Sequence, residues 1–205
     1  AVYYIPPVIN PPVTANRYTL YAETPHVGEA FPNETLLWNA WQNGATANVA
    51  EMTSTASEGT KSMRLTPTPL VWGWGVALAF TNSSENLTQF QTSGRLNFSI
   101  RTTYPGKLEV GFLTGNASDL SLYDVYITLQ PGQYGYLNDG QWHDVSIPIS
   151  AITPYGAPAY GMPSTATLAM DRVTNAFVIA DRYGVTGNAP GSTTPIHVDN
   201  IHWSK

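Results

Sequence analysis

The chain has 205 residues, which is enough for one domain with a substantial core. Charged residues make up only 11% of the chain, the net charge is −5, and Lys and Arg do not cluster, so nucleic acid is not expected as a partner. The sequence has no Cys and no apolar run as long as a membrane span, which excludes disulfides and thiolate metal sites and gives no reason to expect a membrane partner.

Residues 1–17 contain four prolines in two pairs. Such a segment is typical of a stiff, extended linker to a neighbouring domain. We therefore expect a proline-rich linker over 1–17 and a single folded domain over 18–205.

The remainder of the chain is predicted to form short strands separated by Gly, Pro and Asn-rich turns, and no window has a helical period. The expected strands lie at 18–23, 48–52, 62–65, 70–80, 96–101, 108–112, 123–129, 144–149, 174–181 and 195–203. This spacing predicts an all-β fold, an antiparallel β-sandwich of the jelly-roll type.

The stretch 138–150 shows the pattern most clearly. Asn138-Asp139-Gly140 supplies residues that tolerate a turn with positive φ. Val145 and Ile147 then alternate with polar residues, which predicts a half-buried strand that ends at Pro148.

A polar face is expected on the strands near the middle of the chain. If Leu96, Val110 and Val125 point into the core, the alternation turns one set of side chains outward, among them Arg101, Glu109, Asp124 and Tyr126. Such a face can hydrogen-bond sugar hydroxyls while an aromatic ring stacks on the sugar, but it is also compatible with an ordinary solvated sheet.

Trp72 and Trp74 lie in an apolar segment interrupted by glycines. Their phase with Val76 and Leu78 indicates the core, whereas the glycines permit a loop or bulge that would expose them. We expect both to be exposed and to contribute to binding, with the core as the alternative.

Carboxylates at strand ends suggest a calcium site. Glu23 ends the first expected strand, Asp199 lies in the last, and a turn follows Glu58. Calcium binds six to eight carboxylate and carbonyl oxygens, which these groups could supply, although solvated edge carboxylates are an equal alternative.

Local motifs of catalysis are not found. The His residues are not placed near a Gly-x-Ser-x-Gly or His-Glu-x-x-His pattern. A lyase site assembled from Tyr, His and Arg scattered through the fold would leave no local motif, so this alternative stays open.

Several motifs in order resemble one family. They are the acidic first strand, Ser-Met-x-Leu at 62–65, Trp-Gly at 72–75, Leu-x-Phe-x-Ile at 96–100, Asp-Gly-x-Trp-His-x-Val-x-Ile-Pro-Ile-Ser at 139–150 and Val-Asp-Asn-Ile at 198–201. Together they resemble the β-jelly-roll carbohydrate-binding modules of bacterial polysaccharide-degrading enzymes, especially the family-eleven type and the galactose-binding-like domains of glucanases.

The resemblance implies a secreted bacterial, non-catalytic, monomeric module that binds a polysaccharide, with β-glucan favoured, and targets an appended glycoside hydrolase or lyase to it. It implies a structural Ca²⁺ held by Glu23, Thr60, Lys61 and Asp199. It implies ligand contacts from Trp72, Trp74, Arg101, Glu109, Asp124 and Tyr126. The alternatives are an accessory domain that binds no sugar and a jelly-roll lyase or hydrolase. Insertions near 25–47 and 153–170 depart from the family pattern and change the cleft.

Overall fold

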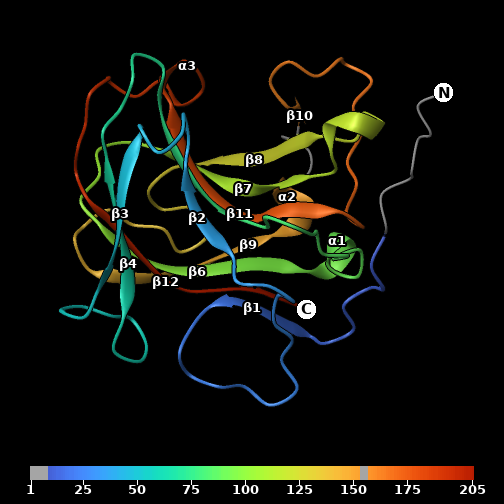
Figure 1. Cartoon of the computed structure of the whole chain (residues 1–205). Coiled ribbons are helices and arrows are strands. Elements are labelled where there is room, and N and C mark those ends of the chain that lie inside the picture. The colour runs from blue at the N-terminus through green and yellow to red at the C-terminus, as the bar shows by residue number, and fades with distance from the viewer. Residues whose placement is uncertain (1–8, 153–156) are drawn as a thin grey trace.

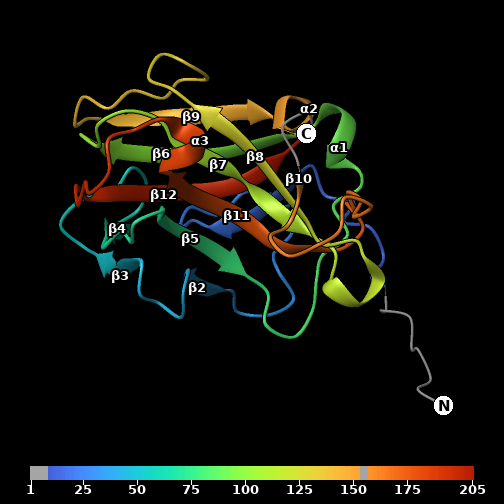
Figure 2. The same cartoon turned by 90° about the horizontal axis from the view of Figure 1, so that it is seen from above.

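A computed structural model describes residues 9–152 and 157–205. It confirms the predicted β-sandwich: two antiparallel sheets of six strands each pack face to face. Figure 1 shows the layers, with β7 and β8 above β6 and β12, and Figure 2 shows them from above.

Sheet A has the order β3-β4-β12-β6-β9, and β1 also pairs with β12. Its strands are β1 (Arg17–Tyr21), β3 (Ala47–Met52), β4 (Ser62–Pro67), β6 (Arg95–Thr102), β9 (Trp142–Pro148) and β12 (Ile196–Ser204).

Sheet B has the order β10-β8-β7-β11-β5-β2. Its strands are β2 (Leu37–Ala40), β5 (Gly73–Ala79), β7 (Leu108–Thr114), β8 (Tyr123–Leu129), β10 (Ala157–Pro158) and β11 (Val173–Arg182).

The helices are single turns: α1 (Phe90–Ser93), the 3-10 turn η1 (Ala117–Asp119), α2 (Ile149–Ile152) and α3 (Tyr183–Thr186). Within the described ranges, no helix has the length and apolar character needed to span a bilayer.

Strand β9 illustrates why these residues form strands. Val145 and Ile147 are buried and pair with Phe98 and Leu96 of β6, while the polar residues between them lie on the outer face. The turn before the strand uses Gly140 at φ 82°, a conformation that costs glycine little.

Aromatic rings fill the space between the sheets. Trp203 of β12 packs edge-on against Phe112 of β7 at 4.9 Å between ring centroids, and its indole N–H donates to the Ala176 carbonyl at 2.9 Å. Phe98 and Phe177 form a similar pair across the core at 5.2 Å. These contacts join the two sheets and fix the outer face of sheet B as a rigid platform.

The expected linker contacts the domain over its described part. Val13 N–H donates to the Asn86 carbonyl at 3.0 Å, and the Gln89 amide donates to the Ala15 carbonyl at 2.6 Å. Residues 9–16 therefore follow the domain surface without forming a strand or helix, and residues 1–8 lie outside the described part of the chain.

Candidate functional site

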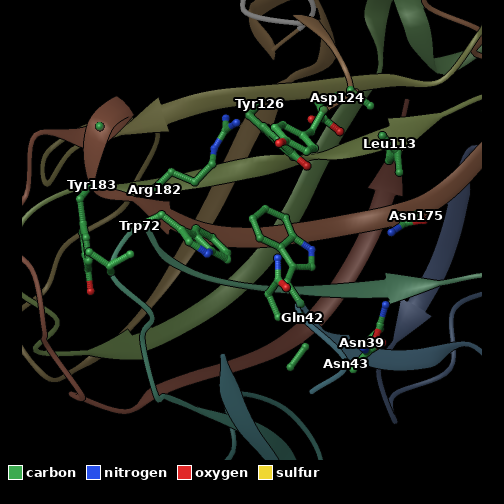
Figure 3. Close-up of a pocket in the computed structure, with 16 residues that line it drawn as sticks. Asn39, Gln42, Asn43, Trp72, Leu113, Asp124, Tyr126, Asn175, Arg182 and Tyr183 are labelled. Carbon is green, nitrogen blue, oxygen red and sulfur yellow. The ribbon is translucent and has the colours of Figure 1, made fainter. Parts of the chain in front are cut away.

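A trough crosses the outer face of sheet B. It has a volume of about 1050 Å³, at the upper end of the range for ligand sites. Figure 3 shows side chains from β2, β8 and β11 and from the loops beside them surrounding it. The trough is lined by Asn39, Ala40, Trp41, Gln42, Asn43, Val71, Trp72, Leu113, Asp124, Tyr126, Ala159, Tyr160, Asn175, Arg182, Tyr183 and Gly184.

The trough holds a pair of stacked indoles. The rings of Trp41 and Trp72 lie 5.9 Å apart between centroids with 29° between their planes. Trp41 rests on Gly75 of β5, where a Cβ atom would come within 2.3 Å of the indole. Tyr126 continues the aromatic surface, 6.4 Å from Trp41. Half-exposed aromatic rings offer an apolar face to a ligand together with a polar edge.

The turn after β2 places Trp41. Its next three residues, Gln42, Asn43 and Gly44, all have positive φ, and Gly44 N–H donates back to the Ala40 carbonyl at 2.9 Å. The backbone N–H of Trp41 donates to the Gly75 carbonyl at 2.9 Å. A left-handed conformation at two consecutive non-glycine residues is costly, and such local strain is typical of binding sites.

A charged group forms the second part of the trough. Arg182 pairs with Glu109, with 2.5 Å between Nη2 and Oε1, and its guanidinium lies 5.2 Å above the Tyr126 ring. Figure 3 shows Arg182 extending toward Tyr126, with Asp124 beyond it. Burial alone would lower the pKa of Arg182, but the hydrogen bonds and charge of Glu109 raise it overall. Arg182 therefore stays charged and is held in place by a partner beneath it.

Asp124 lies beside this group on β8. Burial raises the pKa of its carboxyl, and the charge of Arg182 and a hydrogen bond from Tyr126 offset this only in part. Burial also raises the pKa of Tyr126 well above its ordinary value, so its hydroxyl keeps its proton. The Tyr126 hydroxyl therefore stays a donor, and the Asp124 carboxyl beside the trough accepts from it.

The amide side chains on the rim are available to a ligand. Asn39, Gln42, Asn43 and Asn175 line the trough, and their side chains form no hydrogen bond with another described residue. Each amide offers both donors and an acceptor, which suits sugar hydroxyls.

Four of the six predicted ligand residues lie together on this face. Trp72, Asp124 and Tyr126 line the trough, and Glu109 is buried directly beneath Arg182. Glu109 is only 1% exposed, so its role is to position Arg182 rather than to contact a ligand.

The prediction that Trp74 is exposed is wrong. Trp74 is fully buried, and its indole N–H donates to the Tyr104 hydroxyl at 3.0 Å. Gly73, at φ 130°, breaks the alternation between the two tryptophans, so Trp74 follows the inward phase of β5 and Trp72 turns to the outer face.

The expectation that Arg101 shares a face with Glu109, Asp124 and Tyr126 is also wrong. Arg101 lies on β6 in sheet A, whereas the other three lie on β7 and β8 in sheet B. The outer faces of the two sheets point in opposite directions. The strand phase was right, but alternation does not say to which sheet a strand belongs.

Trp41, Asn39, Asn175 and Arg182 were not predicted as site residues. A signal for Trp41 was present in the Asn43-Gly44 turn that follows it. Asn175 and Arg182 were hidden because β11 has a register irregularity between Asn175 and Phe177, which breaks the period-two pattern of the strand.

The residues predicted to bind calcium lie close together at the end of the β3–β4 hairpin. The Glu23 carboxylate accepts from Thr60 N–H at 2.5 Å and Lys61 N–H at 2.8 Å, and these bonds lower its pKa. Asp199 is fully buried and accepts from Ser57 N–H at 2.8 Å. Burial raises the pKa of Asp199, and its backbone hydrogen bonds offset this only in part.

This arrangement does not fit calcium as it stands, because the carboxylate oxygens face N–H donors instead of an oxygen-lined cavity. In the ranges that the structure covers, no three His, Cys, Asp or Glu side chains are grouped so that they could hold a metal ion. The calcium site stays a prediction.

The sequence of the chain matches a known family over most of its length. A model of carbohydrate binding domain 30 matches residues 29–205. The chain belongs to this family. It is therefore a carbohydrate-binding module, a non-catalytic kind of domain, and carbohydrate is its ligand. No curated protein sequence matches it.

Solved structures of such modules have the same fold. The family 30 carbohydrate-binding module of the cellulosomal cellulase Cel9D-Cel44B of Clostridium thermocellum superposes with a TM-score of 0.61 at 17% identity, covering 92% of this chain and 97% of that chain. The family 11 module of the cellulosomal cellulase Lic26A-Cel5E of Clostridium thermocellum gives 0.59 at 12% identity, covering 94% and 96%. A family 11 module from Clostridium thermocellum in complex with a β-1,3-1,4-mixed-linked tetrasaccharide gives 0.54 at 14% identity, covering 82% and 88%.

Proposed function

We propose that this module binds a β-glucan chain in the trough of sheet B. The observation that carries the proposal is the stacked pair Trp41 and Trp72 beside free amide groups on one open face. Indole faces suit the apolar faces of glucose rings, and the amides suit their hydroxyls. Among the described residues that line the trough, the only arginine is Arg182, and it is already paired with Glu109, so these residues offer no unpaired cation to an acidic glycan.

We also propose that the module acts as a secreted, monomeric bacterial unit that brings an appended glycoside hydrolase or lyase to its polysaccharide. The support is that two modules of similar fold are described as parts of cellulosomal cellulases of Clostridium thermocellum. Release of sugar should not accompany binding, since the module itself has no catalytic role.

The first prediction tests the ligand. In affinity electrophoresis, the protein should be retarded by β-glucans. Replacing Trp41 with Ala should weaken this binding by at least about tenfold, because it removes half of the stacked pair.

Trp142→Ala is the matched control, since Trp142 is a partly exposed tryptophan on sheet A. Its binding should equal that of the unaltered protein. Equal retardation of Trp41→Ala and the unaltered protein would show that the trough is not the binding site.

The second prediction concerns calcium. If Ca²⁺ binds among Glu23, Thr60, Lys61 and Asp199, EDTA should lower the melting temperature and added CaCl₂ should restore it, because a ligand of the folded state alone stabilises that state. Glu23→Gln should abolish the response. A melting temperature that is the same in EDTA and in CaCl₂ would show that the N–H groups, not a metal, satisfy these carboxylates.

A further inference from the structure

A row of basic side chains crosses the outer face of sheet A, on the side of the molecule opposite the trough. In the strand register, Arg64 of β4 lies opposite His197 of β12, which lies opposite Arg101 of β6, which lies opposite Trp142 of β9. Neighbouring strands are about 4.8 Å apart, so these side chains stand next to one another. We call Arg64, His197 and Arg101 the basic row.

The two arginines of the row have no acidic partner. Arg64 forms no hydrogen bond or ion pair with any described residue. Arg101 donates only to neutral oxygens, the Gly140 carbonyl and the Thr55 hydroxyl, both at 2.9 Å. Acidic residues outnumber basic ones by 14 to 9, so carboxylates are not scarce in this chain.

Carboxylates on the same face are engaged elsewhere. Asp199 accepts from the backbone N–H groups of Ser57 and Glu58, and Asp144 accepts from the Ser99 hydroxyl at 2.8 Å. Ser99 precedes Arg101 by two residues on β6 and therefore shares its face. Ser99 lies opposite Asp199 of β12 on one side and opposite Asp144 of β9 on the other, so both carboxylates are next to the row. Among the described residues, no carboxylate is hydrogen-bonded or ion-paired to Arg64 or Arg101.

Two nitrogens of the row are covered from solvent and have no partner. They are Nε of Arg64 and Nδ1 of His197. A buried polar group without a hydrogen bond is costly, so such a group in a native protein requires an explanation, of which an ordered ion or water is one. Burial, and then the charges of Arg101 and Arg64, lower the pKa of His197, which places both guanidinium groups close to its ring.

The row is held in position by its surroundings. The Thr55 hydroxyl accepts from Arg101 and, at 3.1 Å, from the Trp142 indole N–H, so the β3–β4 loop is fixed beside it. Trp142 also packs edge-on against His197 with ring centroids 6.4 Å apart. The Arg101 guanidinium and the His197 ring are therefore held in place before any ligand arrives.

We propose that the basic row is an oxyanion site that binds a carboxylate or sulfate group. Planar guanidinium groups match both oxyanions with paired N–H donors, and the strand register places one arginine on each side of His197. The group is either free in solution or carried by an acidic sugar residue. This site is independent of β-glucan binding, because the trough lies on the other sheet.

The test uses sodium sulfate, glucuronate and glucose at constant ionic strength, with sodium chloride as the reference. The readouts are the melting temperature and the NMR shift of the Trp142 indole N–H. Sulfate should raise the melting temperature above the chloride reference and shift the Trp142 signal with saturation. Arg64→Gln should need about tenfold more sulfate for the same effects, since it loses charge-assisted hydrogen bonds. Because Arg64 has no partner to lose, the variant is expected to fold.

Arg95→Gln is the control, as Arg95 lies on β6 in sheet A and is held by Ser146, and its response should match the unaltered protein. If glucuronate changes the two readouts and glucose does not, the oxyanion that the site binds is the carboxylate of an acidic sugar. If sulfate alone changes them, the site binds free anions. Either result supports the site. Absence of any shift beyond chloride, or the same response in Arg64→Gln, overturns it. Trp41→Ala should respond normally, so failure of glucan binding and failure of this site can be told apart.

Discussion

Replacing Trp74 with Ala should lower the free energy of unfolding by about 3–5 kcal/mol, whereas Trp72→Ala should change it little and instead abolish most glycan binding. Trp74 is fully buried and donates to the Tyr104 hydroxyl, which in turn donates to the buried Asp181 carboxylate at 2.7 Å. Its removal leaves a cavity and breaks this chain of hydrogen bonds. Trp72 is partly exposed and lies in the trough, so its main contacts are with Trp41 and with a ligand.

Urea unfolding followed by circular dichroism measures the first effect, and affinity electrophoresis against β-glucan measures the second. Trp74→Phe is the companion variant, because it keeps most of the apolar volume while removing the indole N–H. It should lose less stability than Trp74→Ala. Weak binding by a fully stable Trp74→Ala, or an unstable Trp72→Ala with normal binding, would reverse the assignment of the two tryptophans.

Gly75→Ala should weaken glycan binding about as much as Trp41→Ala, although it adds only one methyl group. A Cβ atom at this position would lie 2.3 Å from Cε3 and 2.4 Å from Cδ2 of Trp41. The ring cannot stay where it is, and its stacking on Trp72 at 5.9 Å would be lost. The methyl group meets a side chain rather than backbone, so the fold should persist.

Gly184→Ala provides the matched control for this change. Gly184 also lines the trough, but a Cβ atom there would have no atom within 4 Å. Electrophoretic retardation should fall for Gly75→Ala and stay unchanged for Gly184→Ala, with both proteins melting cooperatively. Normal retardation of Gly75→Ala would mean that the position of Trp41 does not matter for the ligand.

The strands and their inward faces could be predicted from the sequence because alternation is a local property. Leu96, Val110, Val125 and Val145 all point into the core as expected. Long-range pairing could not be predicted in the same way: nothing local places β6 in sheet A and β7 in sheet B, and this is why Arg101 was assigned to the wrong face.

The sequence predicted site residues that lie in a regular strand and missed some that depend on turns or on tertiary contacts. Asp124 and Tyr126 lie in a regular strand, so the alternation of the sequence correctly predicted that their side chains point outward. Trp41 depends on the left-handed turn at Gln42 and Asn43, a conformation that is common for Asn but rare for Gln. Arg182 is the last residue of β11, one residue beyond the strand expected from the sequence, and its pairing with Glu109, 73 residues away, is a tertiary contact without a local pattern.

The pairing of β1 with β12 also determines how the module responds to mechanical load. Arg17 lies opposite Ser204, and Lys205 N–H donates to the Asn16 carbonyl at 2.9 Å, so the start of β1 and the end of β12 lie side by side (Figure 1). Hydrogen bonds between antiparallel strands run across the strands, and a pull that separates these ends loads them one pair at a time. Tension applied through residues 9–16 would therefore release this segment first and then peel β1 from β12, while β5 and β11 beneath the trough, in the other sheet, carry little of the force.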